Sequence, residues 1–511
     1  MRSPTRLLVS SLLVIAVITA SVVALPALLR SAPSNDAART EAAEGDPGDA
    51  THEGEGLEEG EGMDADAEFD PDAEVEGQGK RGSGLVEAGV RDATPDGSVS
   101  VPAAPVGGFS PQARLGFSSG DQWEPAIAAD RFGHVYVLYA QYGGVPGCND
   151  CLSPTQIITT SADGGATWSL PRPIQAPGAR GWDSQIVVDP VDGKTVYAAW
   201  LEKDKSDIVV ARSEDFGGKW ETVVADDTNA GTDKPILAVR GEDVYVAYNH
   251  SQTIWVSSSH DRGQTWTSVK AQSTGKGKLG WSLPAGGTVT PDGTVVFGWN
   301  GYEQSGGAKG PVNLYASRSS DGGVTWADVL IETSGSPPEC AADLCGWAYL
   351  GAQITVASDA QGTVYALWNS GPQDPKGAPE RMYLARSTDG GATWSARREV
   401  STAPAGATHA FPALAAWGTG QLRLVWMDNR GGTGSLWNVY TRTSTDGGAK
   451  LSAETDISSA VSGYPYIAPD GFEFPFGDYF EVDVDGNGDT HAVFGEGANY
   501  DAPGSIWYTH D

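Results

Sequence analysis

The chain has 511 residues, a formal net charge of −33 at pH 7, 67 glycines, and 17 residues each of tryptophan and tyrosine. Its length allows two or three average domains or one large all-β unit, and the negative charge excludes nucleic acid as an expected partner, because phosphate binding needs clustered Lys and Arg. Short segments rich in Val, Tyr and Trp, separated by Gly, Asp and Pro, favour an all-β protein with many tight turns.

Residues 1–30 predict export. Arg2 and Arg6 precede an uncharged apolar run from Leu7 to Leu29, which is longer than a usual signal-peptide core and just long enough to cross a bilayer as a helix. Residues 21–24 offer only a weak small-residue cleavage site. The sequence therefore leaves open a cleaved signal peptide and a retained membrane anchor, and both place the rest of the chain at the cell surface or in the extracellular space.

The sequence of residues 31–107 predicts an extended tether. Between Asp36 and Glu76 there are 17 carboxylates against one arginine, with almost no aromatic or β-branched residue. Such a segment buries too little apolar surface to offset its ordering entropy, and its charges repel one another. We expect an extended, disordered acidic linker, with a dedicated interaction tail as the alternative.

The four cysteines form two local pairs, Cys148 with Cys151 and Cys340 with Cys345. In an exported protein, such short spacings predict small disulfides that pin loops. A zinc site built from all four cysteines is the alternative, because two closely spaced pairs can make one.

An octapeptide with the frame Ser-x-Asp-x-Gly-x-Thr-Trp recurs along the chain. Complete copies begin at Ser161, Ser259, Ser319 and Ser387, and degenerate copies begin at Ser213 and Ser444. We expect the aspartate to accept backbone N–H bonds, the glycine to permit a positive φ, and the tryptophan to cover the turn. A ligand-binding role is the alternative for these aspartates, which are Asp163, Asp215, Asp261, Asp321, Asp389 and Asp446.

A second pattern recurs seven times between Ile127 and the C-terminus: an apolar strand, an Asp/Gly turn, and a strand rich in Val, Tyr and Trp. A third strand follows each copy, and the octapeptide and a fourth strand follow in six cases. Repeats of four antiparallel strands predict a β-propeller over residues 108–511, with seven blades expected and six as the alternative. The last repeat has three strands, so we predict that residues 112–118 pair with it and close the ring.

The octapeptide resembles the Asp-box of the bacterial neuraminidase repeat, which is found in sialidases and other secreted propellers. The resemblance implies a sialidase-like architecture over residues 112–511. Sialidases grip the substrate carboxylate with three arginines, the first in a Phe/Tyr-Arg-Ile-Pro motif, where this chain has QWEP with Glu124. Tyr479 and Glu481 stand in for parts of the nucleophile pair and Asp183 for the acid, but an acidic rim disfavours an anionic sugar.

Loops that enter the inner strands and ends of second strands should meet at one face, around the mouth of the central channel. The acidic residues at this face, which include Glu202 and Glu496, have three interpretations: they are the paired carboxylates of a glycosidase, the ligands of a hard cation, or the solvated lining of a channel mouth. The catalytic candidates are Asp183, Asp478, Glu124, Asp233 and Asp428; the ligand-binding candidates are Trp123, Trp182, Trp281, Trp347, Arg430 and His250. Packing between blades is the alternative for the tryptophans.

Residues 483–489 have the spacing of a calcium-binding β-hairpin loop, with oxygen ligands at Asp483, Asp485, Asn487 and Asp489. Phe494 stands where an EF-hand needs glutamate, so an EF-hand is excluded, and a plain acidic turn is the alternative. We expect no required cofactor, and calcium is the ion for which the sequence contains a candidate binding loop.

Two classes of function fit these observations. The first is an exported or surface-tethered, monomeric propeller that binds a glycan or an extracellular protein at its channel mouth. The second is a secreted glycoside hydrolase that uses two of the candidate carboxylates, with exo-sialidase activity as a weaker third hypothesis because the arginines are not matched.

Overall fold

The computed structural model describes residues 108–511, except for residues 230, 275–278, 305–308, 339–348, 374–376, 433–435 and 501–503. Within these residues all regular elements are β-strands, and no helix is present that could cross a membrane. The predicted export segment (1–30) and linker (31–107), together with Cys340, Cys345 and Trp347, lie outside the described residues.

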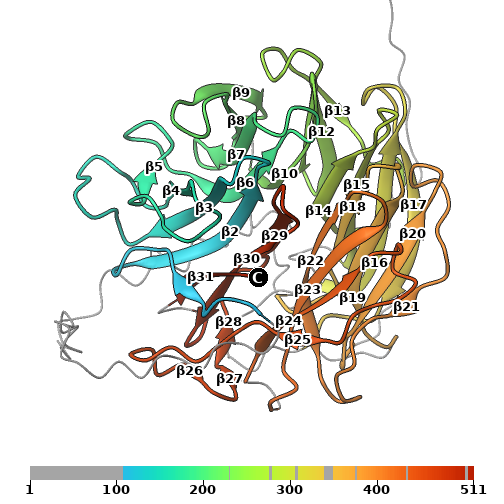
Figure 1. Ribbon diagram of the computed structural model, residues 1–511. Coiled ribbons are helices and arrows are strands. Elements are labelled where there is room, and N and C mark those ends of the chain that lie inside the picture. The colour runs from blue at the N-terminus through green and yellow to red at the C-terminus, as the bar shows by residue number, and fades with distance from the viewer. Residues whose placement is uncertain are drawn as a thin grey trace, which may run out of the picture. The chain divides into compact units, whose positions relative to one another are not determined.

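Seven antiparallel sheets form a ring, in which each sheet packs against the next in chain order and the seventh packs against the first (Figure 1). Six of the sheets contain four consecutive strands. The first contains β2 (Asp121–Ala129), β3 (Val135–Tyr142), β4 (Thr155–Ser161) and β5 (Arg172–Pro173); the second contains β6 (Trp182–Val188), β7 (Val196–Glu202), β8 (Asp207–Ser213) and β9 (Glu221–Asp227); the third contains β10 (Thr232–Arg240), β11 (Asp243–His250), β12 (Thr253–Ser259) and β13 (Thr267–Lys270). The fourth contains β14 (Trp281–Val289), β15 (Val295–Gln304), β16 (Lys309–Ser319) and β17 (Ala327–Ser334); the fifth contains β18 (Ile354–Ser358), β19 (Val364–Ser370), β20 (Arg381–Ser387) and β21 (Arg398–Glu399); the sixth contains β22 (His409–Trp417), β23 (Gln421–Asp428), β24 (Asn438–Ser444) and β25 (Thr455–Asp456).

The seventh sheet joins the two ends of the described chain. Its strands are β28 (Phe474–Pro475), β29 (Glu481–Val484), β30 (Thr490–Gly497), β31 (Gly504–His510) and β1 (Ala113–Arg114), and a separate hairpin of β26 (Ile467–Ala468) and β27 (Gly471–Phe472) precedes them. The N-terminal strand β1 pairs with β31, with Ala113 opposite Tyr508. The predicted closure and the count of seven blades are therefore confirmed, and the six-bladed alternative is wrong.

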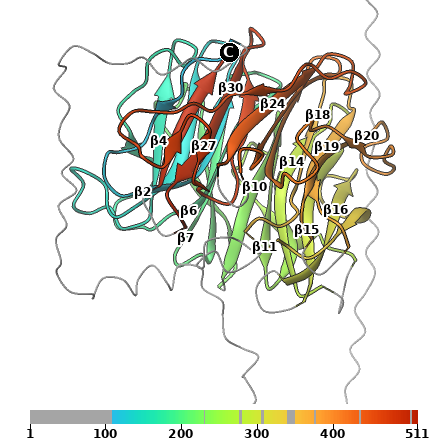
Figure 2. The same ribbon diagram turned by 90° about the horizontal axis from the view of Figure 1, so that it is seen from below.

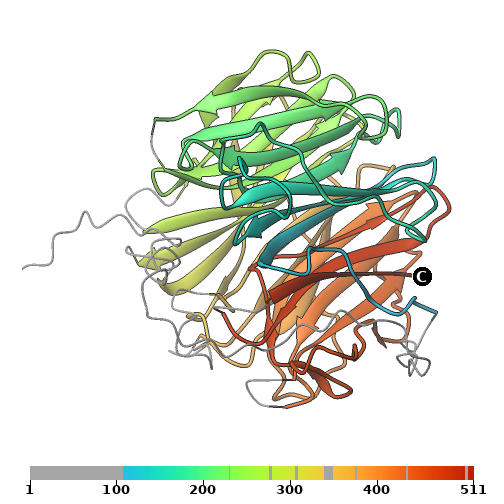
Figure 3. The same cartoon turned by 90° about the vertical axis from the view of Figure 1, so that its left-hand side faces the viewer.

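The core lies between neighbouring sheets rather than at the centre of the ring. Side views show the strands of successive sheets stacked face to face (Figures 2 and 3). Fully buried tryptophans on second and third strands fill these interfaces, because strands rich in large apolar residues on both faces need a neighbour on each side. They are Trp200, Trp299, Trp368, Trp426 and Trp507.

The octapeptides form the turns between third and fourth strands, and their hydrogen bonds repeat from sheet to sheet. In the first copy, Asp163 accepts the Thr167 N–H at 2.8 Å and the Thr167 hydroxyl at 2.6 Å. The Gly165 N–H donates to the Ser161 hydroxyl at 2.8 Å, and the Trp168 indole donates to the Gly165 carbonyl. These bonds satisfy the polar groups of the turn locally.

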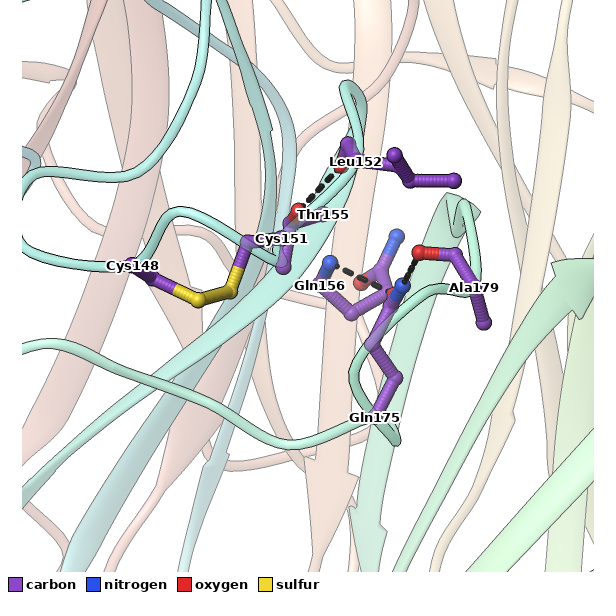
Figure 4. The surroundings of a disulfide bond; sticks show 7 residues. All are labelled: Cys148, Cys151, Leu152, Thr155, Gln156, Gln175 and Ala179. Atoms are coloured by element: carbon purple, nitrogen blue, oxygen red, sulfur yellow. Dashed lines mark hydrogen bonds between the residues drawn. A yellow bond between two sulfur atoms is a disulfide. The ribbon is translucent and has the colours of Figure 1, made fainter.

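One predicted disulfide lies among the described residues. Cys148 and Cys151 are bonded in the loop between β3 and β4, with their Cα atoms 5.5 Å apart (Figure 4). Nearby, the Gln156 N–H donates to the Gln175 side chain at 2.9 Å. The disulfide pins a loop of the first sheet, as the short spacing of the two cysteines predicts.

A central cavity of about 630 Å³, which we call the channel, lies inside the ring. The inner strands β2, β6, β10, β14, β18, β22 and β29 line it. One end lies at Gln185, Lys234, Gln353 and Tyr479, and the other lies at the turns between inner and second strands. We call the end near Lys234 the channel mouth; it is the face where the sequence predicted a functional site.

Candidate functional site

Five inner strands carry a bulge at the mouth end, where their pairing with the second strand shifts register. Four of these bulges contain a non-glycine residue with positive φ: Glu124 (54°), Asp183 (55°), Lys234 (50°) and Phe411 (53°). This region of backbone conformation is uncommon for such residues and costs on the order of 1–3 kcal/mol at each position. Three of the four residues are charged types, and their side chains meet at the mouth.

The first group at the mouth is a carboxyl triad, which consists of Glu124, Asp183 and Asp233 from the first three sheets. Hydrogen bonds link the Asp183 carboxylate to the side chains of both Glu124 and Asp233. Burial, followed by the charges of Asp183 and Asp478, raises the pKa of Glu124 well above its usual range. Burial and the charge of Asp183 raise the pKa of Asp233 to about 8.

Asp183 has the opposite electrostatic environment. Burial opposes its ionisation, but the charge of Lys205, the hydrogen bond from Glu124 and the Lys234 N–H at 3.0 Å outweigh that effect and lower its pKa. At neutral pH, Asp183 is therefore ionised, while Glu124 and Asp233 hold protons and donate to it. The mouth is less negative than its acidic residues suggest, so the expected repulsion of anionic sugars is weakened.

The second group is an ion pair across the mouth. The Lys234 ammonium lies 2.6 Å from Asp478, and the two side chains are only 9% and 7% exposed. Burial alone would lower the pKa of Lys234, but the charge of Asp478 and the hydrogen bond to it outweigh that effect and raise that pKa. The second carboxylate oxygen of Asp478, Oδ1, is buried and has no hydrogen-bond partner among the described residues.

Residues 476–480, which we call the mouth segment, connect β28 to β29 and bring Asp478 to this position. Phe476 packs against Trp123 with ring centroids 4.3 Å apart. The Tyr479 hydroxyl donates to the Ser184 carbonyl at 3.1 Å, and the Tyr349 hydroxyl donates to the Gly477 carbonyl at 2.5 Å. The segment therefore contacts the first, second, third and fifth sheets and forms the floor of the mouth.

Asp428 and Arg430 do not join these groups. Asp428 is fully buried in the sixth sheet and accepts two bonds from the Arg430 guanidinium, at 2.8 and 2.6 Å, and one from the Trp426 indole at 3.1 Å. Arg430 also pairs with Glu454, and its guanidinium lies 3.6 Å from the centroid of Tyr440. Both side chains are engaged in a structural network.

The remaining mouth candidates pack or bond locally. Trp182 is 5% exposed, Trp281 packs at the interface of the fourth and fifth sheets, and His250 meets Trp255 edge-on at 5.4 Å. Two acids at the rim have internal partners, since Glu202 accepts from the Trp200 indole and Glu496 from Gln112. Trp182 is thus buried, and Trp281 is partly buried against the fourth and fifth sheets.

Two of the residues proposed for calcium, Asp483 and Asp485, accept backbone N–H groups. Asp485 Oδ1 accepts the N–H groups of Asn487, Gly488 and Asp489, and Asp483 accepts the N–H groups of Ala129 and Val484. Among the residues that the structure describes, no group of three or more His, Cys, Asp or Glu is arranged to hold a metal ion. Calcium binding stays a prediction.

Sequence reasoning missed Lys234 and Tyr349. Lys234 occupies the bulge position that Glu124 and Asp183 occupy in the first two sheets, whereas its neighbour Asp233 was singled out. A signal exists in the sequence, because Glu124, Lys234 and Phe411 each precede a proline at the start of an inner strand. Aligning these dipeptides would have placed Lys234 at the mouth. Tyr349 leaves no comparable signal.

The fold and the polar mouth define a β-propeller with a candidate site at one end of its channel. Residues 112–341 match the family model described as BNR repeat-like domain. Over these residues the chain is similar to BNR-repeat proteins, and its ring of seven sheets makes it a β-propeller.

Two curated relatives are similar to parts of the chain. A sialidase of Micromonospora viridifaciens is 32% identical over 117 residues, which cover 22% of this chain and 18% of the relative. A xyloglucanase of a Paenibacillus species is 30% identical over 269 residues, which cover 47% of this chain and 23% of the relative. The chain thus spans less than a quarter of the length of either relative.

Solved structures also match the chain, at low identity and with TM-scores below 0.5. A protein of unknown function from Dyadobacter fermentans is 12% identical, with 79% of this chain and 98% of that chain covered and a TM-score of 0.44. The NanB sialidase of Streptococcus pneumoniae is 14% identical, with 78% and 70% covered and a TM-score of 0.40. Similarities of this strength carry no argument about activity.

Proposed function

We propose that this protein binds a glycan at the channel mouth, as an exported or surface-tethered propeller. The observation that carries the proposal is the convergence of Glu124, Asp183, Asp233, Lys234 and Asp478 from four different sheets. Protonated carboxyls and an ammonium donate hydrogen bonds, while Asp183 and the unpartnered oxygen of Asp478 accept them. A sugar, with several hydroxyls that both donate and accept, matches such a mixed surface.

Two further points support a glycan. The strained backbone at Glu124, Asp183 and Lys234 persists although it lowers stability, which is common at binding sites. The two curated relatives are named as a sialidase and a xyloglucanase, both of which act on glycans by name. An extracellular protein ligand is the other partner that the sequence predicted, and the test below distinguishes it.

Glycoside hydrolysis is the second candidate function. Glu124 has a raised pKa and lies beside an ionised carboxylate, which suits a general acid at neutral pH. Its hydrogen-bonded contact with Asp183 is closer than the roughly 5–9.5 Å that separates the carboxyls of glycosidases. Asp478 acts on Glu124 through its charge without a hydrogen bond, so Glu124 and Asp478 are the better acid and base pair.

The test uses the full chain and a panel of xyloglucan, cellulose and galactan oligosaccharides together with sialyllactose. Calorimetry measures binding, and release of reducing sugar measures turnover. Binding that Glu124→Ala and Asp183→Ala weaken at least about tenfold supports the proposal, because each removes a polar partner of the sugar. Asp243→Ala, on the opposite face beside His260, is the matched control. Turnover abolished by Asp478→Asn would favour hydrolysis, and no binding on the panel would overturn the glycan proposal.

A further inference from the structure

The Lys234 to Asp478 ion pair joins two sheets that are not neighbours. Lys234 lies on β10 of the third sheet, and Asp478 lies in the mouth segment of the seventh. In a ring of seven, the third and seventh positions are three places apart, which is the largest separation that such a ring allows. The pair therefore spans the channel axis instead of bridging two adjacent blades.

Other bonds of the mouth segment also cross the ring. Tyr479 reaches the second sheet through the Ser184 carbonyl, at 3.1 Å. The Gln353 side chain, from the fifth sheet, donates to the Asp478 carbonyl at 2.9 Å. Each contact skips at least one blade, so residues 477–479 lie over the end of the channel and close it at the mouth.

The ends and the middle of the segment are held differently. Phe476 and Phe480 are buried in the apolar core, with 1% and 3% of their surface exposed. Gly477, Asp478 and Tyr479, between them, are held by hydrogen bonds and the ion pair, and Gly477 has a positive φ of 88°. Two apolar anchors with a polar centre allow the centre to move while the ends stay in place.

Behind the segment lies the channel of about 630 Å³, within the range of about 300–1,000 Å³ that small-molecule sites occupy. Each inner strand pairs with the second strand on one side only, so its other edge faces the channel without a strand partner. On β2, carboxylates of the seventh sheet accept hydrogen bonds from this edge. Glu481 accepts the Ile127 N–H at 3.0 Å, and Asp483 accepts the Ala129 N–H at 2.8 Å. The other inner strands present the same kind of edge, without a strand partner, to the channel.

We infer that residues 477–479 are a displaceable plug, and that the channel behind it is a second compartment of the ligand site, which takes the end of an uncharged, hydroxyl-rich saccharide. The choice of ligand rests on the proposed function, whereas the plug does not. When the ion pair opens, the mouth and the channel become one continuous site. The saccharide hydroxyls then replace water along the unpaired edges of the inner strands.

Hydrogen exchange read by mass spectrometry tests the plug without any ligand. In the full chain, Lys234→Met removes the charge that holds Asp478, so exchange at residues 477–479 should rise about tenfold or more beyond any rise in β30. Lys203→Met, which breaks the exposed pair with Asp227, is the matched control and should change neither region. If residues 477–479 exchange at the same rate in Lys234→Met as in the wild-type protein, or if exchange in β30 rises equally, the inference of a displaceable plug is wrong.

The same measurement with the oligosaccharide panel tests the compartment. Occupation of the channel by a sugar should slow exchange in the inner strands β10 and β18 as well as at the mouth. Protection confined to residues 123–125 and 183–184 would overturn the compartment and leave mouth binding intact. If no sugar protects either protein from exchange, both the inference of a second compartment and the proposed function are wrong. The comparison without sugar still tests the plug on its own.

Discussion

Lys234 of the third sheet and Asp478 of the seventh form a buried 2.6 Å ion pair across the mouth of the channel. The pair links the only charged side chain of the mouth segment to a residue held in a strained bulge. It is thus both a contact between distant blades and a part of the candidate site.

Removing one partner of this pair should be costly. Lys234→Met or Asp478→Asn leaves the other charge buried and unpaired, so each should lower the free energy of unfolding by about 3–5 kcal/mol. The double variant should lose less than the sum of the two, because no uncompensated charge remains. Urea denaturation of all four proteins measures the coupling. Strictly additive losses would show that the pair contributes no interaction energy.

The octapeptide aspartates should differ in their contribution to stability. Asp261 accepts the Thr265 N–H at 2.9 Å and the Thr265 hydroxyl at 2.6 Å, whereas Asp215 accepts the Lys219 N–H at 2.8 Å and has no threonine partner. Asp261→Ala should therefore lower the Tm more than Asp215→Ala. Differential scanning calorimetry decides the order, and equal Tm values would mean that the threonine hydroxyl adds nothing to the turn.

Stability should fall as the pH rises from about 5 to 8. Burial raises the pKa of Asp233 and of Glu481 to about 8 and that of Asp483 to about 6, above the values near 4 of unfolded chains. Between pH 5 and 8 the folded protein holds more protons on these carboxyls than the unfolded chain does, so the free energy of unfolding decreases as the pH rises. Thermal melts across this range measure the slope.

Glu481→Gln gives a sharper version of the same test. The amide keeps a carbonyl that can accept the Ile127 N–H, but it has no proton to lose. The variant should show a shallower fall in Tm between pH 5 and 8 than wild type, and the difference should be largest at pH 8. A parallel pair of Tm profiles would contradict the assignment of a raised pKa to Glu481.

The disulfide between Cys148 and Cys151 should contribute modestly. It closes a loop with a sequence separation of 3, for which loop entropy gives about 2 kcal/mol. Mass spectrometry after alkylation, with and without reduction, should find this pair oxidised in protein isolated from its native compartment. The double variant Cys148→Ser, Cys151→Ser should lose at most that amount of stability in urea, and a larger loss would point to distortion of the β3–β4 loop.

Much of the fold could be predicted because the signals are local and repeat. The alternation of apolar strands with Asp/Gly turns gave the seven blades, and the three-stranded last repeat predicted the pairing of Ala113 with β31. The octapeptide turns were predictable for the same reason, since Asp163 bonds to Thr167, four residues away. Such contacts depend on sequence spacing alone.

The site was predictable only as a set of residues on one face. Glu124, Asp183, Asp233 and Asp478 were placed there by their position before each inner strand, and the structure brings all four together. Asp428 ends a second strand at the same face, yet Arg430 captures it within the sixth sheet. Sequence order does not reveal which acid finds a local partner.

The sequence by itself determined the repeat, the turns and the face on which polar residues gather, because strand periodicity and turn chemistry act over a few residues. The tertiary structure alone decided that Lys234 meets Asp478, 244 positions later in the chain, and that Glu124 and Asp233 hold their protons. The contact between Lys234 and Asp478 depends on ring closure, which brings together residues that no local sequence pattern links. The protonation of Glu124 and Asp233 depends on burial, because a carboxyl that loses water keeps its proton unless a positive charge compensates it.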